Sequence, residues 1–271
     1  MRMLRTTLMF ALLACPALAI DEMVVVKPGG EGSARKARQF LQDWFGWFGS
    51  SGGLELTGSY LNDPTEAEAY FKDHRPAYGI VGFDFYLEHG GALGMQPVLS
   101  TLPAGKATER YVVLARPGGP AGPADLAGKR LTGRHVAYPK FATSQVLGGS
   151  LEPDQLTVVY DSRTVSAMNA VLDGKADAFV VLEAEWVGIQ KNPKYAAQLR
   201  AIHTSAPIPT AVAVVFGSHA PGPFTQALTK MNEDASAADL LKTMGSAGFA
   251  PIDGPAIEAA ARAYSPKDGG E

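Results

Sequence analysis

Two stretches of the chain repeat one order of hydrophobic and polar positions. Residues 65–84 and 164–183 each hold a helix-length segment, an acidic residue at its end, a short apolar strand and then a carboxylate. In the second stretch, apolar residues recur at helical spacing, at Val165, Met168, Val171 and Leu172. Asp173 and the glycine after it provide the helix stop. Two similar α/β halves predict a ligand held between two lobes.

The remaining chain alternates between short apolar runs and amphipathic segments. The pattern predicts strands at residues 23–26, 54–57, 78–81, 96–101, 110–115, 134–137, 156–159, 178–182 and 211–216. It predicts helices at residues 33–48, 65–73, 164–172, 223–232, 235–244 and 255–264, and another that begins near Thr143. Strands that alternate with helices indicate an α/β fold with two mainly parallel sheets and flanking helices.

Two breaks rich in proline or glycine divide this series. The first covers residues 116–124, R-P-G-G-P-A-G-P-A, and the second covers residues 205–210, S-A-P-I-P-T. Such segments are typical of connections between domains. We therefore expect a discontinuous first lobe of residues 20–115 and 206–271, a second lobe of residues 116–205, and a hinge between them.

The N-terminal residues match a secretory signal. Arg2 and Arg5 precede an apolar run that is shorter than the ~20 residues of a membrane span, and residues 17–19 form an A-x-A cleavage site. We expect residues 1–19 to be a signal peptide and the protein to be periplasmic. Cys15 leaves a second option, because residues 12–15 resemble a lipobox and the cysteine would then anchor a lipoprotein in the membrane.

Composition removes several classes of function. The net charge of −3, from 24 basic and 27 acidic residues, gives no basic surface for nucleic acid. The single cysteine excludes a disulfide within the chain, and the five histidines lack metal-ligand spacing. Signatures of the common exported hydrolases are missing. We therefore expect no catalytic residue, metal, cofactor or nucleic-acid partner.

The glycine-rich loop at residues 27–34, K-P-G-G-E-G-S-A, is a weak nucleotide-binding candidate. It lacks the Gly-Lys-Ser/Thr ending of a P-loop, and Arg35 stands where the dinucleotide fingerprint needs a glycine. A tight turn that points backbone N–H groups at the ligand is the interpretation that we prefer.

Polar side chains occur at two predicted helix starts. Thr143, Ser144 and Gln145 occupy the first, where free N–H groups suit an oxyanion or where the hydroxyls only cap the helix. Thr164 has the same two interpretations at the second start. Arg163 is either a clamp on an anion or a solvated surface side chain.

Other polar side chains follow the repeated strands. Tyr86 comes after the first of them and faces the ligand if the ligand binds beyond the carboxyl ends of the strands. Asp84, Glu183 and Glu185 share this location. They either meet a ligand cation or cap the next helix.

Five segments, taken in order, resemble the phosphate, phosphite and phosphonate substrate-binding proteins of ABC transporters. The segments are D-L-A-G-K-R, A-T-S-Q, S-R-T-V-S-A-M-N-A-V-L-D-G-K-A-D-A, T-S-A-P-I-P and D-L-L-K-T-M-G-S-A-G-F-A-P-I-D. The resemblance implies a two-lobed class II periplasmic binding fold that closes on its ligand. It also implies a non-enzymatic, monomeric protein that delivers a small oxyanion or zwitterion to an ABC permease. A periplasmic sensor or accessory domain for a membrane kinase or complex is the alternative.

The resemblance also implies site residues. The family's hydroxyl-rich Ser-Thr-Ser-Gly loop falls on residues 142–145, its tyrosine on Tyr86, and a histidine that often begins the second-lobe helix on Thr164. Its acid after the second-lobe strand falls near Glu183 or Glu185, and the acid of aminophosphonate binders falls on Ala211. The residues that we expect to bind ligand are Thr143, Ser144, Gln145, Tyr86, Thr164, Arg163 and Glu183.

Overall fold

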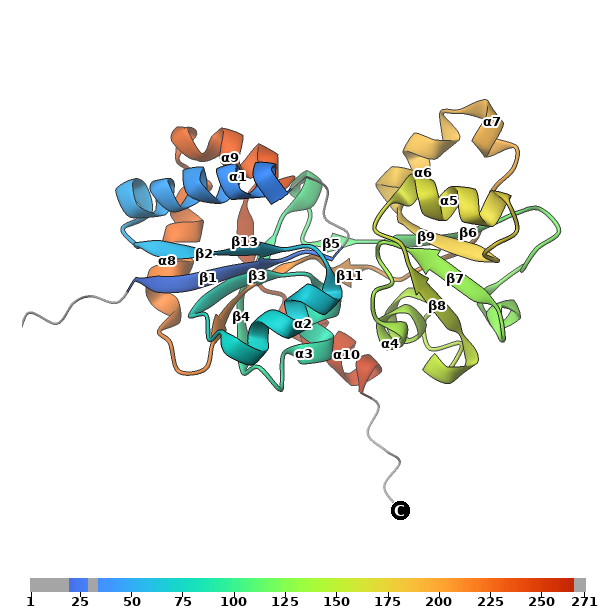
Figure 1. Cartoon of the computed structure of the whole chain (residues 1–271), viewed down its shortest axis with the longest axis horizontal. Helices are drawn as coiled ribbons and strands as arrows, with labels where there is room; N and C mark the ends of the chain where they lie inside the picture. Colours follow the sequence, from blue (N-terminus) through green and yellow to red (C-terminus); the bar gives the residue numbers. More distant parts are fainter. Residues whose placement is uncertain (1–19, 29–33, 266–271) are drawn as a thin grey trace, which may run out of the picture.

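The computed structural model describes residues 20–28 and 34–265, which form two α/β lobes side by side (Figure 1). The predicted signal peptide, Cys15, most of the glycine-rich loop and the first residue of the helix predicted at 33–48 lie outside the described residues. Among the described residues, no helix is long and apolar enough to cross a membrane. Both copies of the repeated unit are confirmed as a helix followed by a strand, one copy in each lobe.

The first lobe contains a six-stranded sheet with the order β13-β4-β12-β3-β1-β2. Its strands are β1 (Asp21–Val26), β2 (Leu56–Leu61), β3 (Tyr78–Val81), β4 (Met95–Thr101), β12 (Val212–Phe216) and β13 (Phe249–Pro251). β1 pairs in parallel with β2 and β3. β12 is antiparallel to β3 and β4, and β13 is antiparallel to β4.

Alternating strand residues of the first lobe face two layers of helices. The helices are α1 (Ala34–Trp47), α8 (Pro221–Met231) and α9 (Ala238–Met244) on one face, and α2 (Pro64–Asp73), α3 (Phe83–His89) and α10 (Gly254–Tyr264) on the other. In β1, Met23 packs into the first layer and Val24 into the second, as the two-residue period of a strand requires. Trp44 of α1 and Phe48 of the π-helical turn η1 (Phe48–Gly52) are fully buried in the first layer.

The second lobe contains a five-stranded sheet with the order β10-β6-β9-β7-β8. Its strands are β6 (Tyr111–Ala115), β7 (Arg130–Gly133), β8 (Thr157–Tyr160), β9 (Ala178–Leu182) and β10 (Arg200–Thr204). Its helices are α5 (Thr164–Leu172), α6 (Glu183–Gln190) and α7 (Pro193–Ala196), and α4 (Pro139–Phe141), which continues as the π-helical turn η4 (Ala142–Val146). One apolar core runs from the α2, α3 and α10 layer of the first lobe to α4 and η4 of the second.

The short antiparallel strands β5 (Thr108–Glu109) and β11 (Ile208–Pro209) join the lobes (Figure 1). Buried hydroxyl groups form hydrogen bonds beside these two segments, in which the chain passes from one lobe to the other. The Thr210 hydroxyl donates to the carbonyl of Thr101 at 2.6 Å, and the Ser205 hydroxyl accepts from the Tyr111 amide at 3.0 Å. The predicted break at residues 205–210 coincides with β11.

The first predicted boundary needs correction. We placed the strand at residues 110–115 in the first lobe, but β6 lies between β10 and β9 in the sheet of the second lobe. The chain therefore crosses at β5, and residues 116–124 lie within the second lobe. Proline and glycine mark turns of any kind, whereas the two-residue crossing at β5 contains neither.

The sheets are mixed and not mainly parallel. β7 pairs in parallel with β8 and β9, but β6 is antiparallel to β9 and β10. The strands that follow the two crossings, β6 and β12, enter their sheets directly from the hinge. Since no crossover helix precedes them, they run opposite to their βαβ neighbours.

Candidate ligand-binding site

Ionisable side chains from both lobes meet near the hinge. Asp84 is in α3, Glu109 is in β5, Tyr111 begins β6, and Glu185 is in the first turn of α6. Arg134 and His135 directly follow β7. We call these six residues the junction cluster.

Glu185 is the centre of the second-lobe part of the junction cluster. Its Oε1 lies 2.9 Å from the Arg134 guanidinium and accepts from the Thr164 hydroxyl at 3.0 Å. Its Oε2 accepts from the Leu182 amide at 2.7 Å and lies 3.0 Å from Nε2 of His135. Burial alone would raise the pKa of Glu185, but the hydrogen bond and charge of His135, the amide and Arg134 together lower that pKa to about 2. Glu185 is therefore an anion at neutral pH.

Local geometry decides which acid of α6 faces inward. Leu182 is the N-cap of this helix, and an acid at the third helical position folds back onto the N-cap amide. That position is Glu185. Glu183 is the first helical residue and is exposed, which corrects its predicted place in the site.

A glycine ends β7 and positions the two charged residues that follow it in the chain. Gly133 has a φ of 141°, and a Cβ atom there would lie 2.8 Å from the carbonyl oxygen of Val180. Only glycine fits this close approach of two strands. Arg134 and His135 leave the strand at this point and reach Glu185. We expected a strand at residues 134–137, but these charged residues belong to the site and the strand ends at Gly133.

Asp84 and Glu109 form the acidic part of the junction cluster. Burial raises the pKa of Asp84 to about 6, against the lowering effects of the Phe85 amide and the charge of His135. Burial also raises the pKa of Glu109, whose Oε1 accepts from the Tyr111 hydroxyl at 3.1 Å. In the part of the chain that the structure describes, neither acid has an ion-pair partner. Both carboxylates are thus desolvated, and nearby positive charge, that of His135 above all, offsets this burial only in part.

The A-T-S-Q segment does not lie at a helix N-terminus, which corrects our expectation for it. The helix starts at Pro139, because proline is favoured at the first helical position. The Thr143 hydroxyl donates to the carbonyl of Pro139 at 3.3 Å, and that of Ser144 donates to the carbonyl of Lys140 at 2.7 Å. Both hydroxyls therefore bond to their own helix.

Gln145 connects the lobes. Its side-chain amide donates to the carbonyl of Ala260 in α10 at 3.0 Å, and its side chain is buried. Figure 1 shows α10 beneath the junction, next to α4. The predicted role of Gln145 in holding an anion is therefore replaced by a contact between η4 and α10.

The other residues predicted to bind ligand, Thr164, Tyr86 and Arg163, lie in three different surroundings. Thr164 joins the site through Glu185. Tyr86 is half-buried, and its ring packs 5.8 Å from that of Phe83 within α3. Arg163 is 79 % exposed and lines a cavity of about 430 Å³ along the outer face of α5, so it does not contribute to the junction cluster.

Our sequence-based site omitted Glu109, Tyr111, Arg134 and His135. The first two lie at the β5 crossing, which has no proline or glycine signal. The other two were assigned to a strand. The glycine at position 133, directly before two charged residues, is the signal that could have indicated a strand end and a site there.

The two lobes contact each other around the junction cluster. The ring of Tyr138, in the second lobe, lies 6.4 Å from that of Phe85 and 5.4 Å from that of His89 in the first lobe. On the other side, the Tyr160 hydroxyl donates to the carbonyl of Asn62 at 3.4 Å. The lobes are therefore in contact with each other in this structure.

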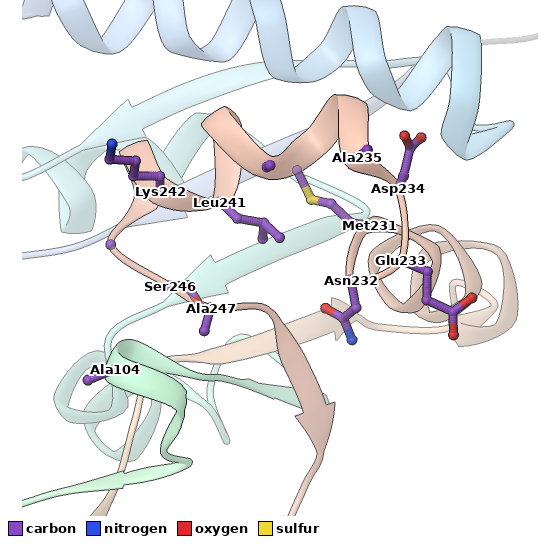
Figure 2. Close-up of a pocket in the computed structure, with 12 residues that line it drawn as sticks. Ala104, Met231, Asn232, Glu233, Asp234, Ala235, Leu241, Lys242, Ser246 and Ala247 are labelled. Carbon is purple, nitrogen blue, oxygen red and sulfur yellow. The ribbon is translucent and has the colours of Figure 1, made fainter.

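A second hollow lies in the first lobe, where α8 ends and α9 begins (Figure 2). It is a cavity of about 620 Å³ lined by Ala104, Met231, Asn232, Glu233, Asp234, Ala235, Ala238, Leu241, Lys242, Gly245, Ser246 and Ala247. Its acidic side chains, Glu233 and Asp234, stand on the side opposite Lys242 in Figure 2. No residue from the second lobe lines it, so hinge closure would not affect a ligand there.

Among the described residues, no three His, Cys, Asp or Glu side chains are placed to hold a metal ion. The site offers instead carboxylates, a tyrosine, an arginine and a histidine from two lobes. Two α/β lobes, a two-strand hinge and charged groups where the lobes meet define a two-lobed ligand-binding protein of the periplasmic class.

The comparison with family models agrees with this class. The model described as ABC transporter, phosphonate, periplasmic substrate-binding protein matches residues 34–256. The chain belongs to this family, whose members are periplasmic transport proteins and not a class of enzymes. A search of curated proteins gave no match.

Solved structures share the fold at low sequence identity. XAC2383 from Xanthomonas citri, bound to chloride, has a TM-score of 0.71 and 15% identity, covering 90% of this chain and 98% of its own. PhnD1 from Prochlorococcus marinus in complex with methylphosphonate has a TM-score of 0.64 and 10% identity, covering 92% and 98%. A binding protein component of an ABC phosphonate transporter from Pseudomonas aeruginosa has a TM-score of 0.64 and 11% identity, covering 90% and 86%. At these identities the comparisons show the class II two-lobed fold alone.

Proposed function

We propose that this protein is exported through its signal peptide, captures a small phosphorus oxyanion in the periplasm and delivers it to an ABC permease. The oxyanion is phosphate, phosphite or a phosphonate, and the protein acts as a monomer. Anchoring through Cys15 as a lipoprotein is the alternative to release of residues 1–19.

The junction cluster is the observation that carries this proposal. Arg134 and His135 come from the second lobe, and the ring of His135 lies 5.5 Å from that of Tyr111, directly after the hinge strand β5. The charge of His135 also acts on Asp84 in the first lobe. A ligand between them contacts both lobes only when the lobes close. Closure thus converts ligand binding into a shape that a permease can recognise.

Titration calorimetry and phosphorus NMR test this proposal. The probes are phosphate, phosphite, methylphosphonate and 2-aminoethylphosphonate, added to protein purified without refolding. We expect at least one probe to bind with a Kd of roughly micromolar or tighter, which corresponds to about −8 kcal/mol. If none of the four binds, the proposed ligand class is wrong.

A further inference from the structure

Helix α10 contacts both lobes, although it follows the sheet of the first. Ile257, Ala260 and Tyr264 recur at steps of three and four, so they share one face of the helix, and all three are buried. This face belongs to the apolar core of the α2, α3 and α10 layer, which continues to α4 and η4 of the second lobe. The helix also packs against the hinge strand β11. It therefore touches the first lobe, the hinge and the second lobe at once.

The first polar contact between α10 and the second lobe is a buried hydrogen bond. The side-chain amide of Gln145, in η4, donates to the carbonyl of Ala260 at 3.0 Å. Movement of η4 away from α10 would break this bond. The net value of such a bond corresponds to a factor of roughly two to ten in an equilibrium between joined and separated forms.

The second polar contact pairs a cation with an aromatic ring. Nζ of Lys140, in α4, lies 4.7 Å from the centroid of the Tyr264 ring, within the range of a cation–π interaction. The Tyr264 hydroxyl donates to the carboxylate of Glu88 in α3, which fixes the position of the ring. Burial, and then the bond to Glu88, raise the pKa of Tyr264, so its hydroxyl remains a neutral donor. Lys140, Tyr264 and Glu88 thus form a series of contacts from α4 of the second lobe to α3 of the first.

These contacts are separate from the junction cluster. The residues that make them, Glu88, Lys140, Gln145, Ala260 and Tyr264, are not among its six members, so the contacts need no ligand there. They are also separate from the two chain crossings at β5 and β11. Figure 1 shows α10 and α4 below the hinge strands, and α1 and α6 above them.

We propose that α10 is a noncovalent third connection between the lobes, which keeps α4 and η4 against the first lobe when the lobes move at the hinge. Movement is then greatest on the opposite side, between α1 and α6. A two-strand hinge permits rotation in several directions, and a fixed contact beside it selects one of them.

Distances between pairs of spin labels, measured in the full chain without ligand by double electron–electron resonance, test this proposal. Cys15, the single cysteine, is replaced by alanine. Lys72→Cys in α2 and Ser150→Cys just after η4 form the pair on the α10 side, and Gln42→Cys in α1 and Lys191→Cys just after α6 form the opposite pair. All four positions are exposed. We expect a narrower distance distribution for the α10-side pair than for the opposite pair.

Two substitutions weaken the contact. Lys140→Glu places an anion over the ring that is bonded to Glu88, and Gln145→Ala removes the hydrogen bond to α10. For the α10-side pair, each should raise the ratio of separated to joined molecules about fivefold, and the double variant about 25-fold. Lys129→Glu makes the same charge change at an exposed lysine of the second lobe and should leave both distributions unchanged.

The results decide the proposal without reference to the ligand. Thermal melts show which variants are folded, and Lys140→Glu alone decides if the double variant is not. An α10-side distribution as broad as the opposite one in the unsubstituted contact would overturn the proposal. An unchanged distribution in Lys140→Glu and in the double variant, or equal broadening in Lys129→Glu, would do so as well. Because no phosphorus compound is added, this proposal and the proposed function can fail independently.

Discussion

The two copies of the repeated unit have the same topology but opposite electrostatics. In the first lobe, β3 leads into α3 and Asp84; in the second, β9 leads into α6 and Glu185. Burial of Asp84, offset only in part by the Phe85 amide and the charge of His135, raises its pKa to about 6. Burial opposes ionisation at Glu185 too, but His135, the Leu182 amide and Arg134 lower its pKa to about 2.

This difference shows that one strand-to-helix junction can serve two purposes. At Glu185, the carboxylate is a fixed structural anion that positions an arginine and a histidine. At Asp84, the backbone amide of Phe85 and the charge of His135 offset burial only in part. The two lobes therefore present a fully paired carboxylate on one side and a weakly compensated one on the other.

The largest expected effect comes from removing the anion of the second lobe. Glu185→Gln leaves Arg134 and His135 without their acceptor, and should lower the free energy of unfolding by roughly 2–3 kcal/mol at neutral pH. Urea denaturation measures this change, with Glu183→Gln as the control. The folded-state pKa is lowered, so the stabilisation is complete above the ordinary value of 4.5 and is lost as pH falls toward about 2. Equal stability of the two variants at neutral pH would contradict the proposed network.

Asp84→Asn should have the opposite sign. The folded-state pKa of Asp84 is raised from 3.8 to about 6, so the ionised carboxylate destabilises the fold fully above pH 6 and no longer does so below 3.8. In the ligand-free protein at mildly alkaline pH, the free energy of unfolding of the variant should be about 1–2 kcal/mol higher than that of wild type. This gain should vanish on acidification. A variant that is less stable than wild type at alkaline pH would show that Asp84 already has a partner.

Gln145→Ala tests the contact between the lobes. Loss of this hydrogen bond to Ala260, together with the loss of a buried side chain, should lower the free energy of unfolding by about 1–2 kcal/mol. Ligand affinity should change less than about threefold, because the side chain faces α10 and not the junction cluster. An affinity loss beyond tenfold at unchanged stability would restore Gln145 as a ligand contact.

Arg163→Ala should have the smallest effect. Its side chain is 79 % exposed and lies 4.0 Å from the Asp161 carboxylate, a pairing that contributes under ~1 kcal/mol. Calorimetry should give an unchanged affinity for the ligand. A marked loss would mean that Arg163 turns inward when the ligand binds.

The architecture could be predicted from the sequence because the spacing of apolar residues reflects which side chains of a helix or strand are buried. The strands at residues 78–81 and 178–182 and the helix at residues 164–172 have the predicted bounds, since long apolar runs and clear stops define them. The first lobe crossing could not be placed, because β5 is two residues long and its partner is β11, far away in sequence.

The chemistry of the site was less accessible, because it depends on contacts between distant elements. In the sequence around α6, only the helix register distinguishes Glu185 from Glu183. The contact between His135 and Glu185 joins residues that are 50 positions apart, so no local sequence pattern indicates it. The A-T-S-Q hydroxyls looked like helix caps, but the proline at position 139 starts the helix one turn earlier. Sequence order therefore indicated the two lobes but not the side chains that meet between them.

The most direct test of the central claim, that the ligand lies between Asp84 and the Glu185 network, is a crystal structure with 2-aminoethylphosphonate bound. We expect closed lobes, with the ligand in contact with side chains of the junction cluster from both lobes. The same ligand bound in the cavity between α8 and α9, or held by one lobe alone, would contradict this claim.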